Sequence, residues 1–421
     1  MIIGPVANPT QSWWLRDQPP APIDPPPLPE RCDIVVIGAG MTGASIAYWL
    51  SERHGLSCVL LDARCVAGGA SGRNGGHLWP NLTSDFERET VADLMDFIAE
   101  RDVDCDLTVL GAVDLAEVAP PPDGDSDDDS DDEGWGDLEV WDGKTCAERF
   151  GTDAFAWGMH HPAAAQFSAA RVTRAILEAA GPRATVCAPV QVLGISDDVS
   201  GGGGTSGGSI VDTDLGPVAA DRVVVATNGW AAELLPELAD ILRPCRNQVL
   251  MTSPSDLPGR WGAGAFSVGA ATGRGDIEEE IYCIKRPDGR LCVGGARSLE
   301  PGAAVGNSDD GSLNESVGER LREFLVTSFP DLAPMSVEAE WTGVIGLTVD
   351  GRPLVGRMPD RAGVYVAAGY NGHGMPQCFG VGKYVADMLA GVAERKLHPH
   401  IRGLSPARFL DKETQAPQPR T

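Results

Sequence analysis

The chain has 421 residues, 43% of them hydrophobic and 22% charged, so it can bury a substantial core and is not dominated by disorder. Sixty acidic and 33 basic residues give a formal charge of -27, which opposes binding to nucleic acid and to anionic membrane surfaces. The ten cysteines form no CxxC pair and no Cys/His cluster with zinc spacing, so we predict reduced thiols and no metal site. No basic region followed by an apolar stretch opens the chain, so a cytoplasmic location is expected.

Residues 1–30 are rich in proline, with seven between Pro19 and Pro29. Such a run cannot form a helix or a strand ladder, which predicts an extended arm laid over the body of the protein. Trp13 and Trp14 are candidate anchors for this arm.

The stretch from Cys32 to Leu50 is nearly uncharged and long enough to span a bilayer. However, it opens with β-branched residues and continues with regularly spaced glycines, which favours a strand, a turn and a helix. We predict strands at 34–37 and 57–62 around a helix at 42–53, which together form a βαβ unit.

Within this unit, Gly38, Gly40 and Gly43 have the GxGxxG spacing of a dinucleotide-binding turn. Glycines there permit close approach to a pyrophosphate, and the start of the helix attracts its negative charge. Asp62 ends the following strand, where it can accept hydrogen bonds from ribose hydroxyls and disfavours the 2'-phosphate of NADP.

A second glycine-rich loop, GGASGRNGGHLWP, follows at 68–80. A nicotinamide dehydrogenase does not need such a loop, whereas the larger ring system of FAD must be covered by backbone. FAD is therefore the predicted dinucleotide, and a mobile surface loop is the alternative interpretation.

The rest of the chain alternates between helical and strand patterns. Helices are expected at 87–101, 168–180 and 314–327, and strands at 109–117, 185–195, 209–214 and from 220 to a turn at 230. The acidic segment 120–136 is predicted to be a disordered loop, and the glycine and serine run near 200–209 a flexible hairpin tip. Strand-like pieces between 244 and 340 predict an antiparallel sheet, and the C-terminal part returns to strand, glycine turn and helix.

From Cys32 to Gly391 these motifs resemble the D-amino-acid-oxidase-like family of FAD-dependent oxidoreductases, and within it the γ-glutamylputrescine oxidase and amine oxidase branch. The resemblance implies an α/β fold in which an antiparallel-sheet substrate domain is inserted into a Rossmann-like FAD-binding domain. The FAD domain would comprise 31–84, 161–235 and 341–395, and the substrate domain 85–160 and 236–340, with a C-terminal tail at 396–421.

The resemblance also implies which residues contact FAD. They fall in the two glycine loops, the end of the second strand, the strand that pairs with adenine, the turn after 220–226 and the C-terminal turn. The expected contacts are Gly38, Gly40, Met41, Thr42, Gly43, Asp62, Ala63, Arg64, Ser71, Gly72, Arg73, Asn74, Gly75, Gly76, Val190, Thr227, Asn228, Gly229, Gly369, Asn371, Gly372, His373, Gly374 and Met375. Gly343 aligns with the family's flavin-linking cysteine, so noncovalent FAD is expected.

In this family the resemblance implies hydride transfer from the carbon bearing an amine to flavin N5, followed by hydrolysis of the imine. Ile345 stands where amino-acid oxidases hold the substrate carboxylate with arginine, which points to a small amine substrate unless a different arginine substitutes. The oxygen-activating lysine aligns with Cys292. Oxygen is nevertheless the expected acceptor, with hydrogen peroxide as product.

His373, His77, Tyr282, Trp341 and Tyr370 are the candidate catalytic or substrate-contacting residues, because aromatic faces can hold an ammonium group. Each also has a purely structural interpretation, as a core or backbone-bonding residue. Two alternatives for the whole protein remain open: a flavin dehydrogenase or tailoring oxidase acting on a larger amine, and a non-catalytic FAD-binding protein.

Overall fold

The computed structural model describes residues 4–16, 26–81, 83–118, 138–198, 208–255, 264–268, 280–330 and 335–410. The acidic segment 120–136 and most of the glycine and serine run lie outside the described residues, so their predicted disorder stays a prediction. The described helices are α1 (Met41–His54), α2 (Asp85–Glu100), α3 (Gly143–Phe150), α4 (Ala169–Ala179), α5 (Ala231–Leu234), α6 (Glu315–Ser328), α7 (Cys378–Leu389), α8 (Pro399–Arg402) and α9 (Ala407–Leu410).

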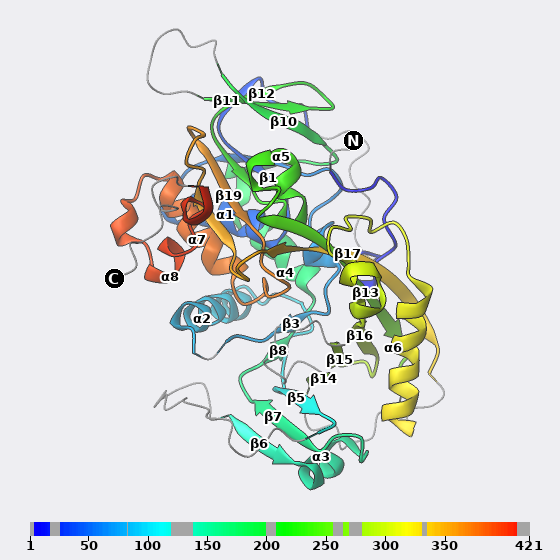
Figure 1. Cartoon of the computed structure of the whole chain (residues 1–421). Coiled ribbons are helices and arrows are strands. Elements are labelled where there is room, and N and C mark those ends of the chain that lie inside the picture. The colour runs from blue at the N-terminus through cyan, green and yellow to red at the C-terminus, as the bar shows by residue number, and fades with distance from the viewer. Residues whose placement is uncertain are drawn as a thin grey trace, which may run out of the picture.

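Two large sheets organise the chain (Figure 1). The strands of the first are β1 (Arg31–Ile37), β2 (Cys58–Leu61), β9 (Ala184–Cys187), β10 (Val192–Asp197), β11 (Ser209–Thr213), β12 (Val218–Val225), β18 (Leu354–Arg357) and β19 (Val364–Ala368). Strands β19, β12, β1, β2 and β9 run parallel. Strand β11 pairs antiparallel with β12, β18 antiparallel with β19, and β10 antiparallel with β11. This is the predicted Rossmann-like unit, with β1, the turn, α1 and β2 in the expected order.

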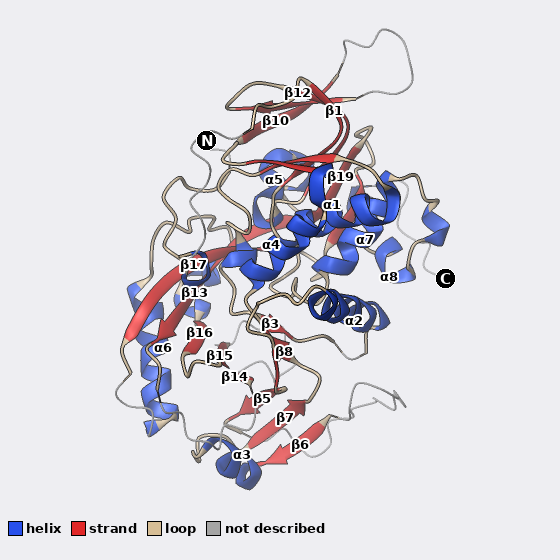
Figure 2. Cartoon of the chain, turned by 180° about the vertical axis from the view of Figure 1, so that it is seen from behind, coloured by secondary structure: helices blue, strands red, loops and turns tan. Residues whose placement is uncertain are grey.

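Both faces of this sheet are covered, which explains the uninterrupted apolar run in β1. Ile34 and Val36 pack against α1, α2, α4 and α7, which lie together on one face in Figure 2. Val35 and Ile37 pack on the opposite face against α5 and the β10–β11 pair. No helix in the described part of the chain is long and apolar enough to cross a bilayer.

The second sheet has the strand order β17-β13-β16-β15-β14-β5-β7-β6. Its strands are β5 (Ala112–Ala116), β6 (Glu139–Asp142), β7 (Trp157–His161), β13 (Leu242–Thr252), β14 (Ala265–Val268), β15 (Ile281–Lys285), β16 (Leu291–Gly295) and β17 (Val337–Thr348). All neighbours are antiparallel except β14 and β5, which are parallel. A small third sheet joins β3 (His77–Leu78), β8 (Ala165–Gln166) and β4 (Thr108–Val109).

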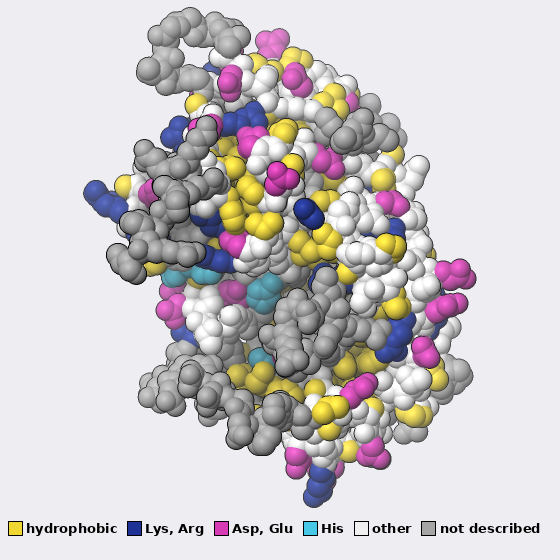
Figure 3. Space-filling view, in the orientation of Figure 1, with side chains coloured by type: hydrophobic (Ala, Val, Ile, Leu, Met, Phe, Trp, Pro, Cys, Tyr) yellow, Lys and Arg dark blue, Asp and Glu magenta, His cyan; other side chains and the backbone are white. Residues whose placement is uncertain are grey.

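One face of the second sheet packs against α3 and α6 through a phenylalanine-rich core that includes Phe150, Phe266 and Phe324. The opposite face turns toward the first sheet. On the surface drawn in Figure 3, acidic and basic side chains are interspersed rather than gathered into a basic patch.

Several strand and domain boundaries in the structure differ from those predicted from the sequence. The region 185–195 is two strands, β9 and β10, because Pro189 between them has no N–H to donate to a ladder. Helix α2, assigned to the substrate domain, packs its apolar face into the core shared by α1 and α7. The boundary at 341 falls inside β17, and α8 contributes Ile401 to the same core, so 396–410 is not a separate tail.

Residues 17–25 of the predicted N-terminal arm lie outside the described residues, and the described part is attached mainly through Trp14. Its ring is buried and its Nε1 donates to the carbonyl of Asn74 (2.6 Å), in the second glycine loop. Thr10 adds a second attachment, because its backbone N–H donates to the carbonyl of Asp310 (2.8 Å). The arm therefore braces the loop that the sequence assigns to the cofactor.

Candidate active site

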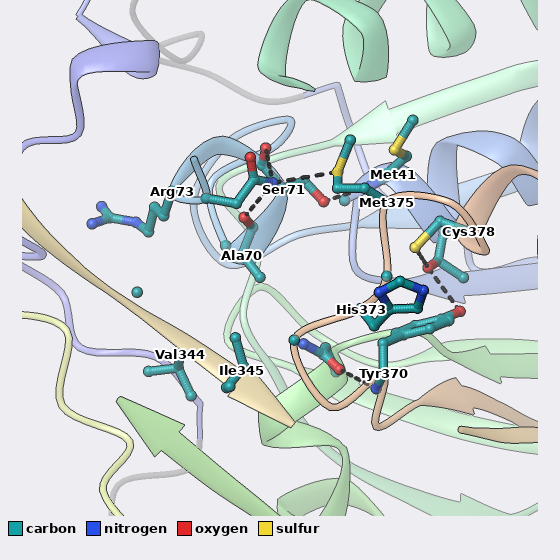
Figure 4. Close-up of a pocket in the computed structure, with 18 of the residues that line it drawn as sticks. Met41, Ala70, Ser71, Arg73, Val344, Ile345, Tyr370, His373, Met375 and Cys378 are labelled. Carbon is teal, nitrogen blue, oxygen red and sulfur yellow. Dashed lines mark hydrogen bonds between the residues drawn. The ribbon is translucent and has the colours of Figure 1, made fainter. Parts of the chain in front are cut away.

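A cavity of about 770 Å³ lies between the first sheet and the open face of the second. Its walls come from both glycine loops, the turn after β12, the turn before α7 and strands β5, β7, β13, β14, β15, β16 and β17. Figure 4 shows part of this wall, with Ser71, Met375, His373 and Ile345 brought together from distant segments. A cavity of this size suits a small-molecule or cofactor site.

The first glycine turn leaves no room for side chains. Gly38 has a φ of +104°, and a Cβ there would lie 2.7 Å from the carbonyl oxygen of Ala226. A Cβ on Gly43 would lie 1.9 Å from the carbonyl oxygen of Gly38, so Gly43 lets α1 pack directly on the turn. The N-terminus of α1 consequently reaches the cavity wall at Gly40, Met41 and Thr42.

Asp62 fixes the same turn from the end of β2. Its carboxylate accepts hydrogen bonds from the backbone N–H groups of Ala39 (2.8 Å) and Arg64 (2.9 Å), while burial raises the pKa of the carboxyl group. Asp62, Ala63 and Arg64 all line the cavity, as does Val190, whose N–H donates to the carbonyl of Asp62 (2.7 Å). The structure thus brings together the predicted dinucleotide residues of three separate strand ends.

The second glycine loop is held by its own asparagine. Asn74 Oδ1 accepts from the N–H of Gly76 (2.8 Å), and Asn74 Nδ2 donates to the carbonyl of Ala70 (3.1 Å). The loop is also tied to α1, because Ser71 Oγ accepts from the N–H of Met41 (2.8 Å). Ser71, Asn74 and Gly75 line the cavity, so the loop forms a second backbone-rich wall.

The Arg73 side chain points away from the residues clustered around His373 (Figure 4). Its guanidinium group donates to the carbonyls of Thr10 (2.8 Å) and Thr342 (2.9 Å), and burial lowers its pKa to about 10. Buried Asp310 lies 3.7 Å from it and also pairs with Arg64 at 2.7 Å. The side chains of both arginines therefore hold the arm and β17 in place, and sequence reasoning missed Asp310 as their shared partner.

The C-terminal turn has three positions with left-handed backbone conformation. Gly369, Asn371 and Gly372 have φ values of +77°, +54° and +84°. Asn228 Oδ1 accepts from the N–H of Gly369 (3.0 Å) and so connects this turn to the turn after β12. Asn228, Asn371, Gly372, Gly374 and Met375 all line the cavity.

His373 lines the cavity from this turn and is anchored by a residue that the sequence did not reveal. Its Nε2 lies 2.8 Å from Oε2 of Glu87, a buried carboxylate on α2. Glu87 also accepts from Gln377 Nε2 (2.8 Å) and from the N–H of Asn81 (2.8 Å). Because the carboxylate is an acceptor, His373 carries a proton on Nε2, and the lone pair of the neutral ring lies on Nδ1.

Tyr370 and Thr42 meet beneath the same turn. Thr42 Oγ1 is 3.0 Å from the Tyr370 hydroxyl and 3.2 Å from Cys378 Sγ. Burial raises the pKa of Tyr370 well above its usual value and that of Cys378 to about 11, so both groups are protonated at neutral pH. Both side chains line the cavity, and they favour a dry, neutral wall there.

One cross-strand row of the second sheet places Asp114, Ser267, Tyr282 and Val249 on the cavity wall. Asp114 pairs with Ser267, Ser267 with Tyr282, Tyr282 with Gly294, and Gly294 with Val249. Paired residues project on the same face, so this row forms the wall opposite the glycine loops. Tyr282 was predicted, whereas Asp114 and Ser267 were missed because strand register is not visible in one sequence.

His77 lies at the junction of the two walls. Its ring centroid is 5.5 Å from that of Trp79 and 6.0 Å from that of Tyr282. Burial lowers its pKa to about 4, so the imidazole is neutral at neutral pH. His77 therefore suits a hydrogen-bonding role, and the structure adds Trp79 and His161 beside it.

Six predicted residues lie behind the cavity wall rather than on it: Gly43, Gly72, Gly76, Gly229, Gly369 and Trp341. The glycines allow neighbouring backbones to approach, as for Gly229, where a Cβ would lie 2.8 Å from the carbonyl oxygen of Ile345. Trp341 is fully buried and its Nε1 donates to the carbonyl of Arg73 (2.9 Å). The structure thus gives Trp341 a supporting role in place of the predicted substrate contact.

Several buried polar atoms on the wall have no hydrogen-bond partner among the described residues. They include Thr227 Oγ1, Trp230 Nε1, His77 Nε2 and Ser267 Oγ. Unpaired buried polar groups are costly, so their concentration on one cavity indicates a bound ligand with polar groups. Together with the two glycine cradles and the start of α1, these residues fit a long dinucleotide such as FAD.

Comparison with known proteins supports this fit. The chain is 27% identical over 410 residues to γ-glutamylputrescine oxidoreductase of Escherichia coli, covering 86% of this chain and 85% of the relative. It is 26% identical over 391 residues to glycine oxidase of Geobacillus kaustophilus, covering 86% and 94%. The crystal structure of L-proline dehydrogenase from P. horikoshii has a TM-score of 0.73 at 20% identity, covering 91% and 99%. Residues 33–388 match the DAO family, and the chain therefore belongs to this family of FAD-dependent oxidoreductases.

Proposed function

We propose that this protein oxidises the C–N bond of a small, cationic amine with noncovalently bound FAD and passes the electrons to oxygen. When bound, FAD would accept a hydride at flavin N5 from the carbon bearing the amine, giving an imine that hydrolyses, and oxygen would be reduced to hydrogen peroxide. The observation that carries the proposal is a cavity whose glycine-built end continues into an aromatic and acidic wall. Such a wall suits an ammonium group and a neutral reaction site.

The position of Ile345 supports an amine over an α-amino acid. Ile345 lines the cavity from β17, and its Cδ1 would lie 3.7 Å from a Cβ on Gly372, in the C-terminal turn. An isoleucine cannot form the paired hydrogen bonds by which arginine holds a carboxylate. Arg64 and Arg73 also line the cavity, but both are committed to Asp310.

Noncovalent attachment is supported by the side chains near these positions. Gly343, on the cavity wall, has no side chain that could form a bond to flavin. Cys378 also lines the cavity, but its raised pKa of about 11 keeps it in the poorly nucleophilic thiol form.

His373 and His77 are the groups best suited to handle the substrate proton. The amine must lose a proton before its carbon can give up a hydride. With Nε2 bonded to Glu87, Nδ1 is the nitrogen of the His373 ring left to accept that proton. His77, neutral because of its lowered pKa, can accept a hydrogen bond from the amine or orient it.

A second candidate function is oxidation of an amino acid with Arg297 as the carboxylate partner. Arg297 lines the cavity just after β16, and its Nη1 lies 4.0 Å from Cys245 Sγ. A substrate carboxylate near β16 would have this guanidinium group within the same cavity.

The test is anaerobic mixing of the purified yellow protein with panels of amines and amino acids while flavin absorbance is recorded. Bleaching by amines is the expected result, followed by peroxide formation when air is admitted. Bleaching by α-amino acids alone would contradict the amine proposal and favour the Arg297 alternative. Slow reoxidation in air would indicate a dehydrogenase, and no bleaching by any compound would indicate a non-catalytic flavoprotein.

A further inference from the structure

Asp114 is an acidic group on the cavity wall that the reaction described above does not use. It lies on β5, and its pairing with Ser267 directs both side chains to the face that carries Tyr282. All three side chains line the cavity. Neighbouring strands are about 4.8 Å apart, so the two strand spacings from β15 to β5 separate Tyr282 and Asp114 by about 10 Å.

Among the described residues, the ion pair that the structure gives Asp114 is with His161. Its Oδ2 lies 3.3 Å from His161 Nε2, and neither nitrogen of that ring makes a well-directed hydrogen bond within the part of the chain that the structure describes. Beside it, Ser267 is only 5% exposed and its Oγ has no hydrogen-bond partner among the described residues. The Ser267 hydroxyl and the Asp114 carboxylate can therefore both accept hydrogen bonds from a ligand cation.

Aromatic rings connect this acidic end to the region beside the glycine loop. The ring centroids of Trp79 and His161 are 5.0 Å apart, those of His77 and Trp79 5.5 Å, and those of His77 and Tyr282 6.0 Å. Such a wall can cover an apolar chain, and the face of Trp79 can attract a cation. The path from Tyr282 to Asp114 is therefore suited to a carbon spacer that ends in a positive charge.

The charges on this part of the wall also favour a cation. Glu280 lines the cavity from the position just before β15, two residues before Tyr282, whereas Arg297 follows β16, three strands away from β5. Arg64 and Arg73 are held by Asp310 on the opposite wall. A ligand carboxylate at Asp114 would meet a like charge, and a ligand ammonium would meet an opposite one.

We propose that Asp114, Ser267, His161 and Trp79 form a subsite for a second cationic group of the substrate. The preferred substrates would then be diamines or polyamines, in which a spacer of several carbons separates the reacting amine from a distal ammonium. This inference rests on the proposed function for the reacting amine, and adds a specificity site at the opposite end of the same cavity.

The test compares three ligand series of matched chain length on the FAD-bound protein: α,ω-diamines, n-alkylamines and ω-amino acids. Flavin reduction gives KM, and perturbation of the oxidised flavin spectrum gives a dissociation constant for ligands that do not react. The variants are Asp114→Asn and, as matched control, Asp212→Asn, an exposed aspartate on β11 away from the cavity. Ser267→Ala provides a second test if Asp114→Asn fails to retain FAD.

We expect the wild-type protein and Asp212→Asn to have a KM or dissociation constant about tenfold or more lower for diamines than for alkylamines. One charge-assisted hydrogen bond accounts for a difference of this size. The preference should fall about tenfold in Asp114→Asn and in part in Ser267→Ala. A preference that is unchanged in both variants, or a preference for ω-amino acids, would overturn the subsite. If no amine reduces the flavin, amine oxidation is wrong, and the dissociation constants still decide whether Asp114 selects a second cation.

Discussion

The two walls of the cavity are built from different materials. The wall on the first sheet consists of backbone at Gly38, Gly40 and Gly75, where a Cβ would meet atoms 2.6 to 3.0 Å away. The wall on the second sheet consists of side chains, with Asp114, Ser267 and Tyr282 in one cross-strand row. Backbone can hold a constant cofactor in many proteins, whereas side chains can be exchanged to suit each substrate.

This difference explains why the first wall is visible in the sequence. A turn that must exclude Cβ atoms leaves glycines at fixed spacing, and its position between a strand and a helix can be checked along the chain. A side-chain wall leaves no such pattern, because its members come from several strands and are aligned only by register. His373 combines a feature that the sequence shows with one that it does not, since its glycine turn was predicted and its partner Glu87 was not.

The largest effect is expected when one methyl group is added to the first glycine turn, which supports the backbone wall. In Gly43→Ala the new Cβ would overlap the carbonyl oxygen of Gly38, so α1 must move away from the turn. We expect a protein that binds no FAD and is therefore colourless. We also expect the free energy of unfolding to fall by roughly 3 kcal/mol or more, which is the upper end of the range for substitutions that overpack a core. FAD absorbance after purification and urea unfolding measure both effects.

Gly194→Ala is the matched control, because a Cβ on Gly194 would meet no atom within 4 Å. This variant should stay yellow and as stable as the wild type. A yellow Gly43→Ala protein with normal stability would contradict the role given to the first turn.

The next largest effect is expected where the two walls meet, in Glu87→Gln. The carboxylate accepts hydrogen bonds from His373 on one oxygen and from Gln377 on the other. The amide of glutamine has only one oxygen and cannot accept both, so the imidazole loses its fixed orientation. We expect kcat/KM to fall about 10- to 100-fold, as for loss of a charged hydrogen-bond partner, and the pH profile of kcat to change. FAD content should be retained.

Glu89→Gln, on the exposed side of the same helix, is the control and should leave both the rate and the pH profile unchanged. An altered rate in Glu87→Gln with an unaltered pH profile would reduce Glu87 to a purely structural role. Steady-state rates between about pH 6 and 9 distinguish these outcomes.

The smallest effect concerns His77 and appears only at low pH. Its pKa is about 4 in the folded protein and near its ordinary 6.5 in the unfolded chain, so the unfolded chain takes up a proton first as pH falls. The stability due to neutral His77 is complete above about pH 6.5 and is lost as pH falls toward 4. Relative to His77→Gln, wild type should lose on the order of 1 kcal/mol between about pH 7.5 and 5.5.

Urea unfolding at the two pH values measures this difference, and the comparison with His77→Gln cancels the titration of the other groups. Equal losses in both proteins would show that His77 is solvated or charged in the folded state. In that case the wall beside Trp79 and Tyr282 would be less dry than the structure indicates.

The sequence by itself determined the βαβ unit, both glycine loops and the C-terminal turn, because each depends on local spacing and on glycine at positions that exclude a Cβ. Only the tertiary structure decided that α2 joins the core of the first sheet and presents Glu87 to His373. It also decided that Arg73 turns away toward Asp310, and that Asp114 and Tyr282 share a face. These relations join residues far apart in the chain, and they depend on strand register and helix packing, which no local pattern encodes.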